Sequence, residues 1–239
     1  SMFFKLHINN ILENGEYVVD GSKASKRNAT IVYSGGDDVF IVGAWDDVIG
    51  LAIDLSDSLK KYSQGTLTIS AGIGIFPKKY PVKAIARETG LLEEASKRVQ
   101  DKNAVTLFED VYNQDCKYEF DCGEQTYKWD IFKRRVIGEK YVLIDSCFSD
   151  DDEKGMAAIY RLLNYIRNLD DKINLARLAY LLGRMQVSAK DSDEKEEKYK
   201  AFSKKLYEWI SNDPKGENRR ELITAIYIYV YLHRKEEER

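Results

Sequence analysis

Two consecutive aspartates, Asp37 and Asp38, follow a glycine pair in the segment Tyr33-Ser34-Gly35-Gly36-Asp37-Asp38. Apolar, β-prone runs flank this segment, so we predict a tight hairpin whose turn carries paired acids. Glycine permits a positive φ and lets a ligand approach the backbone closely. Adjacent carboxylates can hold a hard divalent cation against phosphate oxygens, which makes Asp37 and Asp38 candidate metal ligands. The alternative is an ordinary turn with two solvated aspartates.

On a regular strand consecutive side chains point to opposite faces, but a turn breaks this alternation and could aim both carboxylates at one metal. With Mg²⁺ they would clamp a triphosphate and stabilise the negative charge that develops on it. Two-metal phosphoryl transfer generally uses another acid from a neighbouring strand. By pattern, neither Asp54 nor Asp57 is well placed to supply it. Lys97 lies near the end of a predicted helix and could reach terminal phosphates, although most lysines at helix ends are surface residues.

The elements that must position these residues alternate between helices and strands. Besides the hairpin, we predict a helix over 2–14, a short strand over 17–19, a helix from Trp45 through Leu59, a strand over 66–75, a helix from Pro81 to about Gln100 and a strand over 104–108. With one strand added at the front, this order becomes β-α-β-β-α-β, the ferredoxin-like arrangement of split β-α-β units. We expect that first strand to have been removed or to be supplied by another segment.

Two segments have uses that the sequence leaves open. Residues 66–75 alternate strictly, and one face carries only small residues, among them Ser70 and Gly72. This face could leave room for a nucleotide over the sheet, or it could receive a closely packed helix. Residues 20–28 form a basic loop whose Lys23, Lys26 and Arg27 could meet phosphate or could simply be solvated.

The totals exclude several classes of function. The 239 residues are 44% apolar and carry a formal net charge of -3, so the whole surface does not attract nucleic acid. The three cysteines form no disulfide framework, and Cys116 and Cys122 lack further zinc ligands. Only two histidines occur, at opposite ends of the chain, which argues against a histidine-based hydrolase. Because no long apolar run or signal peptide is visible, we expect a cytoplasmic protein.

The second half is predicted to be helical, after an irregular connection over 109–128. Helices are expected at about 130–148, 153–168, 173–186, 193–211 and 217–237. The third contains Leu175, Leu178, Ala179, Leu181 and Leu182 and is expected to be a core helix. We find no catalytic constellation in this part of the sequence.

The chain resembles the second palm domain and the C-terminal helical domain of the CRISPR polymerase, the large subunit of type III interference complexes, here of the Csm type. The segment 33–38 and the residues after it, Val39-Phe-Ile-Val-Gly-Ala-Trp-Asp46, carry the resemblance most specifically. It continues through 67–73, 81–86, 95–97 and 102–108, and in the helical part through 160–163 and 173–182. It therefore spans nearly the whole chain.

The resemblance implies an α+β fold: a ferredoxin-like palm over 1–120 that lacks its first strand, then an all-α helical bundle over 121–239. It implies that the palm polymerises ATP into 3′–5′ cyclic oligoadenylates, second messengers of antiviral defence, when the complex holds target RNA. Asp37 and Asp38 would be the catalytic acids and would bind Mg²⁺ or Mn²⁺. The residues implied to contact ATP are Ser34, Gly35, Gly36, Ser70, Lys97 and Lys102.

The implied partners are the other subunits of the effector complex, including its small helical subunits, and guide and target RNA through the complex; no membrane is involved. The family's nuclease segment, its first palm and its zinc-binding cysteines are absent from this sequence. We therefore expect these residues alone to be inactive, or nearly so, as a synthase. Two alternatives stay open: a non-catalytic scaffold module, and a cyclase of the diguanylate type, which usually has Glu-Phe where Asp38-Val39 stands here.

Overall fold

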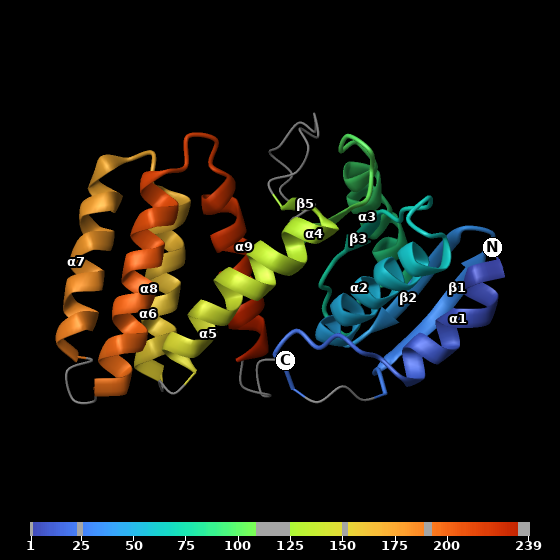
Figure 1. The fold of residues 1–239 in the computed structure, drawn as a ribbon, viewed down its shortest axis with the longest axis horizontal. Coiled ribbons are helices and arrows are strands. Elements are labelled where there is room, and N and C mark those ends of the chain that lie inside the picture. Colours follow the sequence, from blue (N-terminus) through green and yellow to red (C-terminus); the bar gives the residue numbers. More distant parts are fainter. Residues whose placement is uncertain (1, 23–25, 109–124, 150–152, 189–192, 234–239) are drawn as a thin grey trace. The chain divides into compact units, whose positions relative to one another are not determined.

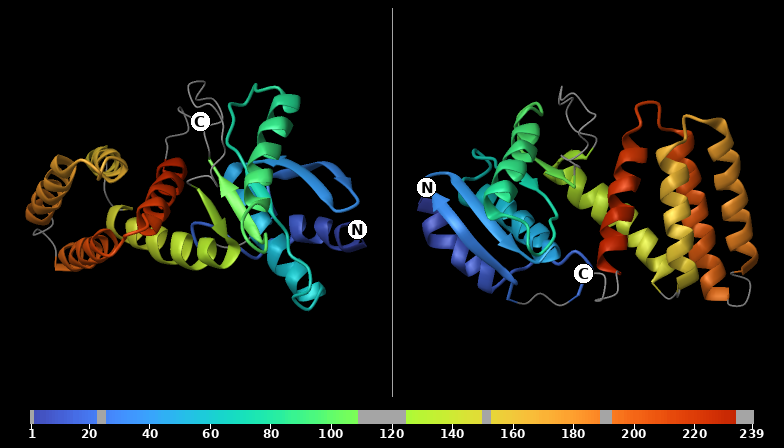
Figure 2. Two further views of the ribbon diagram at one scale, coloured as in Figure 1. Left: turned by 90° about the horizontal axis from the view of Figure 1, so that it is seen from above. Right: turned by 180° about the vertical axis from the view of Figure 1, so that it is seen from behind.

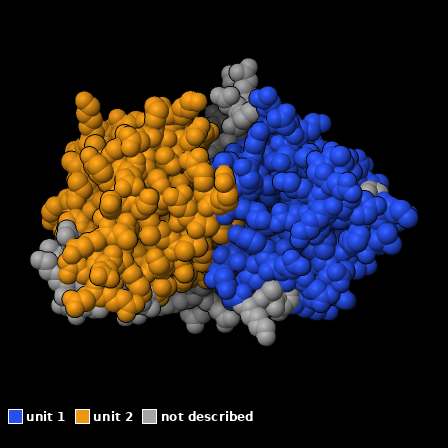
Figure 3. Space-filling view, in the orientation of Figure 1, with its two compact units in different colours: residues 1–133 blue, residues 134–239 orange. Residues whose placement is uncertain are grey.

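The computed structural model describes residues 2–22, 26–108, 125–149, 153–188 and 193–233 (Figure 1, with further views in Figure 2). The chain divides into two compact units, residues 1–133 and 134–239, which Figure 3 colours separately. The first unit mixes helices with strands and the second is helical, so the predicted α+β class with a helical second part is confirmed. No helix among the described residues is long and apolar enough to cross a membrane. Cys116 and Cys122 lie outside the described residues.

The first unit contains two small sheets and three long helices. Its elements are α1 (Met2–Glu13), β1 (Ala29–Gly35), β2 (Asp38–Gly43), α2 (Trp45–Tyr62), β3 (Ala71–Ile73), α3 (Val82–Lys97), β4 (Ala104–Leu107) and β5 (Thr126–Lys128). Strands β1 and β2 form an antiparallel pair. In the second sheet β4 lies between β3, to which it is parallel, and β5, to which it is antiparallel.

Helices α1 and α2 pack together against one face of the β1–β2 hairpin, as Figure 1 shows. The two helices contribute Phe3, Phe4, Ile8, Ile11, Leu51, Leu55 and Leu59 to this core. The hairpin contributes alternate residues, Val39 and Ile41 from β2 and Ile31 from β1. The hairpin therefore has one face committed to the core, and its other face points away from both helices.

A buried arginine joins the segments at the base of the hairpin. Arg27 is only 5% exposed, and its guanidinium donates to the Tyr17 carbonyl at 2.6 Å and to the Asp54 carboxylate. Asp54 also accepts hydrogen bonds from the backbone amides of Glu16 and Tyr17, each at 3.0 Å. The prediction that Arg27 lies in a solvated or phosphate-binding loop is wrong. The short strand predicted over 17–19 is also wrong, because Asp54 and Arg27 bond to the backbone of Tyr17 there.

Two glycines make room for the Arg27 guanidinium. A Cβ atom at Gly15 would lie 2.7 Å from Cζ of Arg27, and one at Gly50 would lie 2.9 Å from the same atom. At Gly50 the carbonyl oxygen of Tyr17 would also be only 2.5 Å away. Because real Cβ atoms do not approach so closely, the buried ion pair depends on glycine at these positions.

The strand predicted over 66–75 is hydrogen-bonded as a strand only over Ala71–Ile73. Its small-residue face packs against α3, since a Cβ atom at Gly72 would lie 2.7 Å from Cβ of Leu92 and would also meet the α3 backbone at Thr89 and Glu93. Of the two uses considered for this face, close helix packing is the one found at Gly72. The alternative, a nucleotide over this face, is wrong at this position because no space is left there.

The second unit continues a helix that begins in the first. This helix runs without interruption through α4 (Trp129–Ile131), the π-helix η1 (Phe132–Tyr141) and α5 (Val142–Phe148). It is followed by α6 (Glu153–Arg167), α7 (Lys172–Ser188), α8 (Asp193–Ser211) and α9 (Glu217–Leu232). The five predicted helices are therefore confirmed within the described residues; residues 234–237, which the last prediction included, lie outside them. A π-helical stretch of this length is uncommon, and the sequence gives no sign of it.

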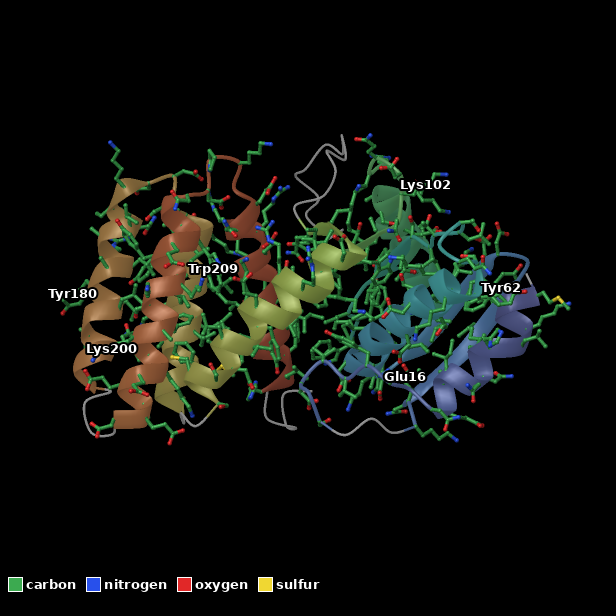
Figure 4. All side chains as sticks on the ribbon, in the orientation of Figure 1. Glu16, Tyr62, Lys102, Tyr180, Lys200 and Trp209 are labelled. Carbon is green, nitrogen blue, oxygen red and sulfur yellow. The ribbon has the colours of Figure 1, made fainter. Side chains whose placement is uncertain are left out.

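Helix α7 lies at the edge of its unit instead of in the core. Leu178 and Leu181 are buried, but Leu175 is 51% exposed and Ala179 lies at the surface. Tyr180 is 69% exposed and points away from the bundle (Figure 4). The expectation that all the apolar residues of this helix are buried is thus wrong, because packing covers only one side of it.

A buried charge cluster links three helices of the second unit. Lys140 is fully buried in η1, and its Nζ donates to Oε2 of Glu221 in α9 at 2.6 Å. The same ammonium lies 4.6 Å from the ring centre of Trp209 in α8. Nε of Arg135 reaches the same Glu221 oxygen at 3.1 Å. The buried carboxylate therefore compensates a lysine that has no exposure to water.

We predict opposite effects for the same substitution at two glycines in helices. Gly50→Ala should lower the free energy of unfolding by about 1–3 kcal/mol, the range for overpacking a core, because the new methyl group collides with Arg27 and Tyr17. Gly90→Ala should raise it by about 0.5–1 kcal/mol, because this glycine lies in the interior of α3 and a Cβ atom there would meet nothing within 4 Å. Urea denaturation of both variants would measure this. Equal stabilities would contradict the role given to Gly50.

We also predict strong coupling between Lys140 and Glu221. Glu221→Gln should destabilise the protein by about 3–5 kcal/mol, because it leaves a buried ammonium without its carboxylate. The double variant Lys140→Met with Glu221→Gln should recover most of that loss, since no buried charge then remains unpaired. A double-mutant cycle measured by denaturation tests this. Additive effects of the two substitutions would show that the pair is not coupled.

Candidate active site

The paired aspartates lie at the tip of the β1–β2 hairpin. Gly35 pairs with Asp38, which leaves Gly36 and Asp37 as a two-residue turn. Gly36 has a φ of +64°, and a glycine of positive φ at this first position is what a type II′ turn requires. The predicted hairpin is therefore confirmed. Both aspartates are exposed to solvent.

The register of the hairpin determines where Asp38 lies. A β-bulge occurs at Val32, between the pairs Ile31–Ile41 and Tyr33–Phe40. Because Val39 and Ile41 face the core, Asp38 begins β2 on the opposite face, away from α1 and α2. The ring of Tyr33 lies over Gly35, where an added Cβ atom would be 2.6 Å from Cζ of the tyrosine. The turn thus presents its backbone and carboxylates outward.

Lys97 is the predicted phosphate-binding residue whose electrostatics connect it to the turn. Its Nζ lies 2.6 Å from Oε1 of Glu93, one helical turn earlier in α3. The pKa of Lys97 is raised first by this hydrogen bond with Glu93 and further by the negative charges of Asp38 and Asp37. Lys97 therefore stays protonated, and the end of α3 brings a cation into the field of both aspartates.

The other predicted contacts are less closely tied to the turn. Ser34 is exposed at the end of β1, opposite Val39. Ser70 has a buried hydroxyl for which the described residues offer no hydrogen-bond partner. Lys102 is exposed on the connection from α3 to β4 (Figure 4). Within the described part of the chain, no hydrogen bond or ion pair joins Ser70 or Lys102 to Asp37 or Asp38.

The connection that carries Lys102 is conformationally unusual. Asp101, Lys102 and Asn103 all have positive φ, between 54° and 67°. The Asn103 carbonyl accepts a hydrogen bond from the Trp129 amide at 3.3 Å, and Lys128 pairs with Asp101 at 3.6 Å. The indole nitrogen of Trp129 donates to the carbonyl of Ile69, next to Ser70, at 2.9 Å. Trp129 therefore links the backbones that carry Ser70 and Lys102.

The donor set at the turn suits Mg²⁺ bound together with a nucleotide. Magnesium prefers oxygen ligands and is usually held by one or two carboxylates, waters and substrate phosphates instead of a complete protein cage. Asp37 and Asp38 supply two such carboxylates. Across the described residues no group of three or more acidic, histidine or cysteine side chains could hold a metal. The aspartate pair is thus a partial site that phosphate oxygens would complete.

Sequence reasoning missed Glu93 and Trp129. Glu93 stands four residues before Lys97, and this spacing on a helix predicts an ion pair, so the signal was present. Trp129 follows the irregular segment 109–128, and no local pattern links it to Ile69 or Asn103. Its contacts depend on the pairing of β4 with β5, which joins residues distant in sequence.

Two protein-family models match the chain. Residues 1–106 match the second palm domain of Cas10/Cmr2. Residues 145–235 match the second helical domain of the Cmr2 subunit of the CRISPR RNA silencing complex. The two matches fall in the two structural units, one in each.

Curated relatives align along almost the whole chain. The Cas10/Csm1 protein of Mycobacterium tuberculosis, described as a CRISPR system single-strand-specific deoxyribonuclease of subtype III-A, is 42% identical over 239 residues, covering 99% of this chain and 27% of the relative. The Streptococcus thermophilus protein of the same description is 37% identical, with coverage of 99% and 27%. The chain thus spans about a quarter of the length of these relatives.

Solved structures share the fold. A crystal structure of a Csm1–Csm4 cassette in complex with one ATP has a TM-score of 0.68 and 23% identity, over 97% of this chain and 31% of that one. The crystal structure of Csm1 from T. onnurineus has a TM-score of 0.62 and 23% identity, over 94% and 32%. Because two models of one family match most of the chain and its relatives align over nearly all of it, we conclude that the chain belongs to the Cas10/Csm1 family of type III-A CRISPR systems, as a second palm domain followed by a helical domain.

Proposed function

We propose that this chain supplies the palm of a nucleotidyltransferase that joins ATP into cyclic oligoadenylates when the full-length subunit, within its complex, binds target RNA. The observation that carries the proposal is the exposed Asp37–Asp38 turn, together with a protonated Lys97 in the field of both carboxylates. The ATP bound to the Csm1–Csm4 cassette, which shares this fold, supports a nucleotide as the substrate.

In the proposed reaction a ribose 3′-hydroxyl of one ATP attacks the α-phosphorus of another. A 3′–5′ phosphodiester bond forms, the bond from the α-phosphorus to the bridging oxygen breaks, pyrophosphate leaves and the hydroxyl proton passes to solvent. Asp37 and Asp38 would hold Mg²⁺ or Mn²⁺, which when bound neutralises phosphate charge and helps to ionise the attacking hydroxyl. Gly35 and Gly36 let the triphosphate approach the backbone, and Ser34 can donate a hydrogen bond to it.

Lys97 orients the terminal phosphates in this proposal. Its ammonium already bonds to Glu93, so a bound triphosphate shares or replaces that carboxylate as the partner of Nζ. Lys102 would contact the nucleotide from the connection between α3 and β4, and Ser70 from the segment before β3; Trp129 holds both backbones. These roles separate residues that bind the metal from residues that bind phosphate.

The exposed aspartate pair on a glycine turn supports nucleotidyl transfer as the first candidate function. A scaffold role is the second candidate, and the exposed apolar side chains of α7, including Leu175 and Tyr180, favour it. A full-length complex that never forms product would support the scaffold, and product formed from GTP instead of ATP would support a diguanylate-type cyclase.

We predict that both aspartates are needed for synthesis. The test uses a full-length Cas10/Csm1 that carries this chain in place of its own matching region, assembled with its partners and supplied with target RNA, Mn²⁺ and ATP. Asp37→Ala and Asp38→Ala should each lower the rate of cyclic oligoadenylate formation at least 100-fold, because two carboxylates hold the metal against phosphate charge. Asp20→Ala, an exposed acid outside the turn, should leave the rate unchanged. Full activity without both acids would refute the assignment.

We predict that Lys97 distinguishes nucleotides by their phosphates. Lys97→Met should weaken the binding of ATP, measured with Mg²⁺ on the isolated chain, by about 10–100-fold, the value of a charged hydrogen bond. Binding of AMP should change little, because AMP lacks the terminal phosphates. Lys97→Arg keeps the charge and should retain most of the ATP affinity. Equal losses for ATP and AMP would show that Lys97 acts on the fold and not on the phosphates.

A further inference from the structure

Four cations gather on the turn that precedes α3 and on the first two turns of that helix. Lys78 and Lys79 lie in the turn, and Lys83 and Arg87 lie one helical turn apart on α3; all four are exposed. Residues 74–87 contain no acidic residue. Within the described part of the chain the three lysines take part in no ion pair, and Arg87 has a distant one, at 3.8 Å from Glu88. We call these four residues the basic turn.

A stacked pair of aromatic rings and two hydrogen bonds hold the backbone of the basic turn in place. The rings of Phe76 and Tyr80 stack with centres 5.3 Å apart and planes 15° apart. The Tyr80 hydroxyl donates to Oε1 of Glu88 at 2.9 Å, and the Tyr80 amide donates to the Pro77 carbonyl at 2.9 Å. Glu88 is only 2% exposed, so its carboxylate supports the turn without presenting negative charge to solvent. The four cations therefore extend from a backbone whose conformation is fixed by these contacts.

The basic turn lies at the N-terminus of α3, an end of a helix that favours negative charge. The first turn of α3 contains no acidic residue, and its N-terminal residue Pro81 provides no side-chain cap. The charges near the N-terminus of α3 are instead positive, on Lys83 and on the two lysines of the preceding turn. The whole chain has a net charge of -3, so this positive patch is a local reversal of sign. An anion bound here would interact favourably with the cations of the patch and with the N-terminus of α3.

We propose that the basic turn binds the phosphodiester backbone of single-stranded nucleic acid. A protein partner fits less well, because the centres of protein interfaces are apolar and depleted of lysine. The patch instead offers four flexible cations around one exposed apolar side chain, Val82. Nucleic-acid backbones are bound mainly by such lysine and arginine contacts, which do not depend on base sequence.

The basic turn is separate from the candidate active site. Lys83 and Lys97 stand 14 residues apart on α3, so about 21 Å of helix separates the two regions at 1.5 Å per residue. Neither aspartate of the hairpin and none of the proposed ATP contacts belongs to the patch. Nucleic-acid binding here therefore does not depend on whether the chain contributes to ATP polymerisation.

The test measures binding of a fluorescent 20-nucleotide single-stranded RNA to the whole chain by anisotropy, at 50–300 mM salt, with DNA of the same sequence as a second probe. The variant replaces Lys78, Lys79, Lys83 and Arg87 by glutamine. It should bind at least tenfold more weakly at the lowest salt. The slope of log affinity against log salt should fall by about 3, since each lost single-strand phosphate contact removes about 0.7. Equal losses for both probes assign binding to the shared backbone, and a larger loss for RNA adds contacts to the 2′-hydroxyl.

The matched control replaces four exposed lysines elsewhere in the same unit by glutamine: Lys5, Lys26, Lys60 and Lys61. It has the same net charge as the test variant and should keep wild-type affinity within about threefold, since salt at these concentrations screens the attraction between the nucleic acid and charges that do not contact it. Thermal melting of the test variant should stay at or above wild type, because cations leave a helix N-terminus. The proposal fails if the wild-type chain binds neither probe, or if the control loses as much affinity as the test variant.

Discussion

The palm unit depends on the buried ion pair between Arg27 and Asp54. Asp54 lies in the middle of α2, and through its two oxygens it holds the backbone of Glu16 and Tyr17, the segment that follows α1. Arg27 brings in the segment that leads to β1, where the Asn28 amide also donates to Asp47 of α2 at 2.9 Å. One charged cluster therefore fixes the end of α1, the start of the hairpin and the face of α2 that they share.

Burying the Arg27–Asp54 pair costs free energy, because both charged groups lose their contacts with water. It succeeds because the carboxylate is satisfied by the guanidinium and by two backbone amides, and because glycines at positions 15 and 50 leave space for the arginine. The second unit uses the same principle in its Lys140–Glu221 pair. In both units a buried ion pair joins helices or segments that hydrophobic packing alone would place less specifically.

Much of this architecture could be predicted from the sequence, because the signals were local. Apolar periodicity predicted the long helices, and Gly35-Gly36 between two β-prone runs predicted the hairpin. The failures have one physical origin, since each depends on a partner distant in sequence. Arg27 resembles an exposed loop residue in the sequence, because its partner Asp54 lies 27 residues away. Residues 66–70 alternate like a strand but lack a hydrogen-bonded neighbour among the described strands, and α7 is apolar on a side that its unit leaves uncovered.

The residues of the candidate site also differ in whether local sequence signals could predict them. Asp37 and Asp38 were identifiable from residue type and spacing, and their exposure on a glycine turn agrees with that hypothesis. The sequence could not predict that the charges of both aspartates act on Lys97, because this depends on how α3 packs in the fold. Ser70, in the segment before β3, and Lys102, in the connection before β4, are joined through Trp129, so their relation to the turn depends on tertiary structure.

The bulge at Val32 and the two-stranded sheet determine how the hairpin twists and bends. Among the described strands, β1 and β2 pair only with each other, and the aspartates lie at the far end from the anchored base. Two-stranded ribbons are more strongly twisted than wider sheets, and a bulge adds a local bend. The twist and the bend of the hairpin therefore set where the two carboxylates lie relative to its base. A strand that paired with an open edge of this hairpin would change its twist, and with it the position of the two carboxylates.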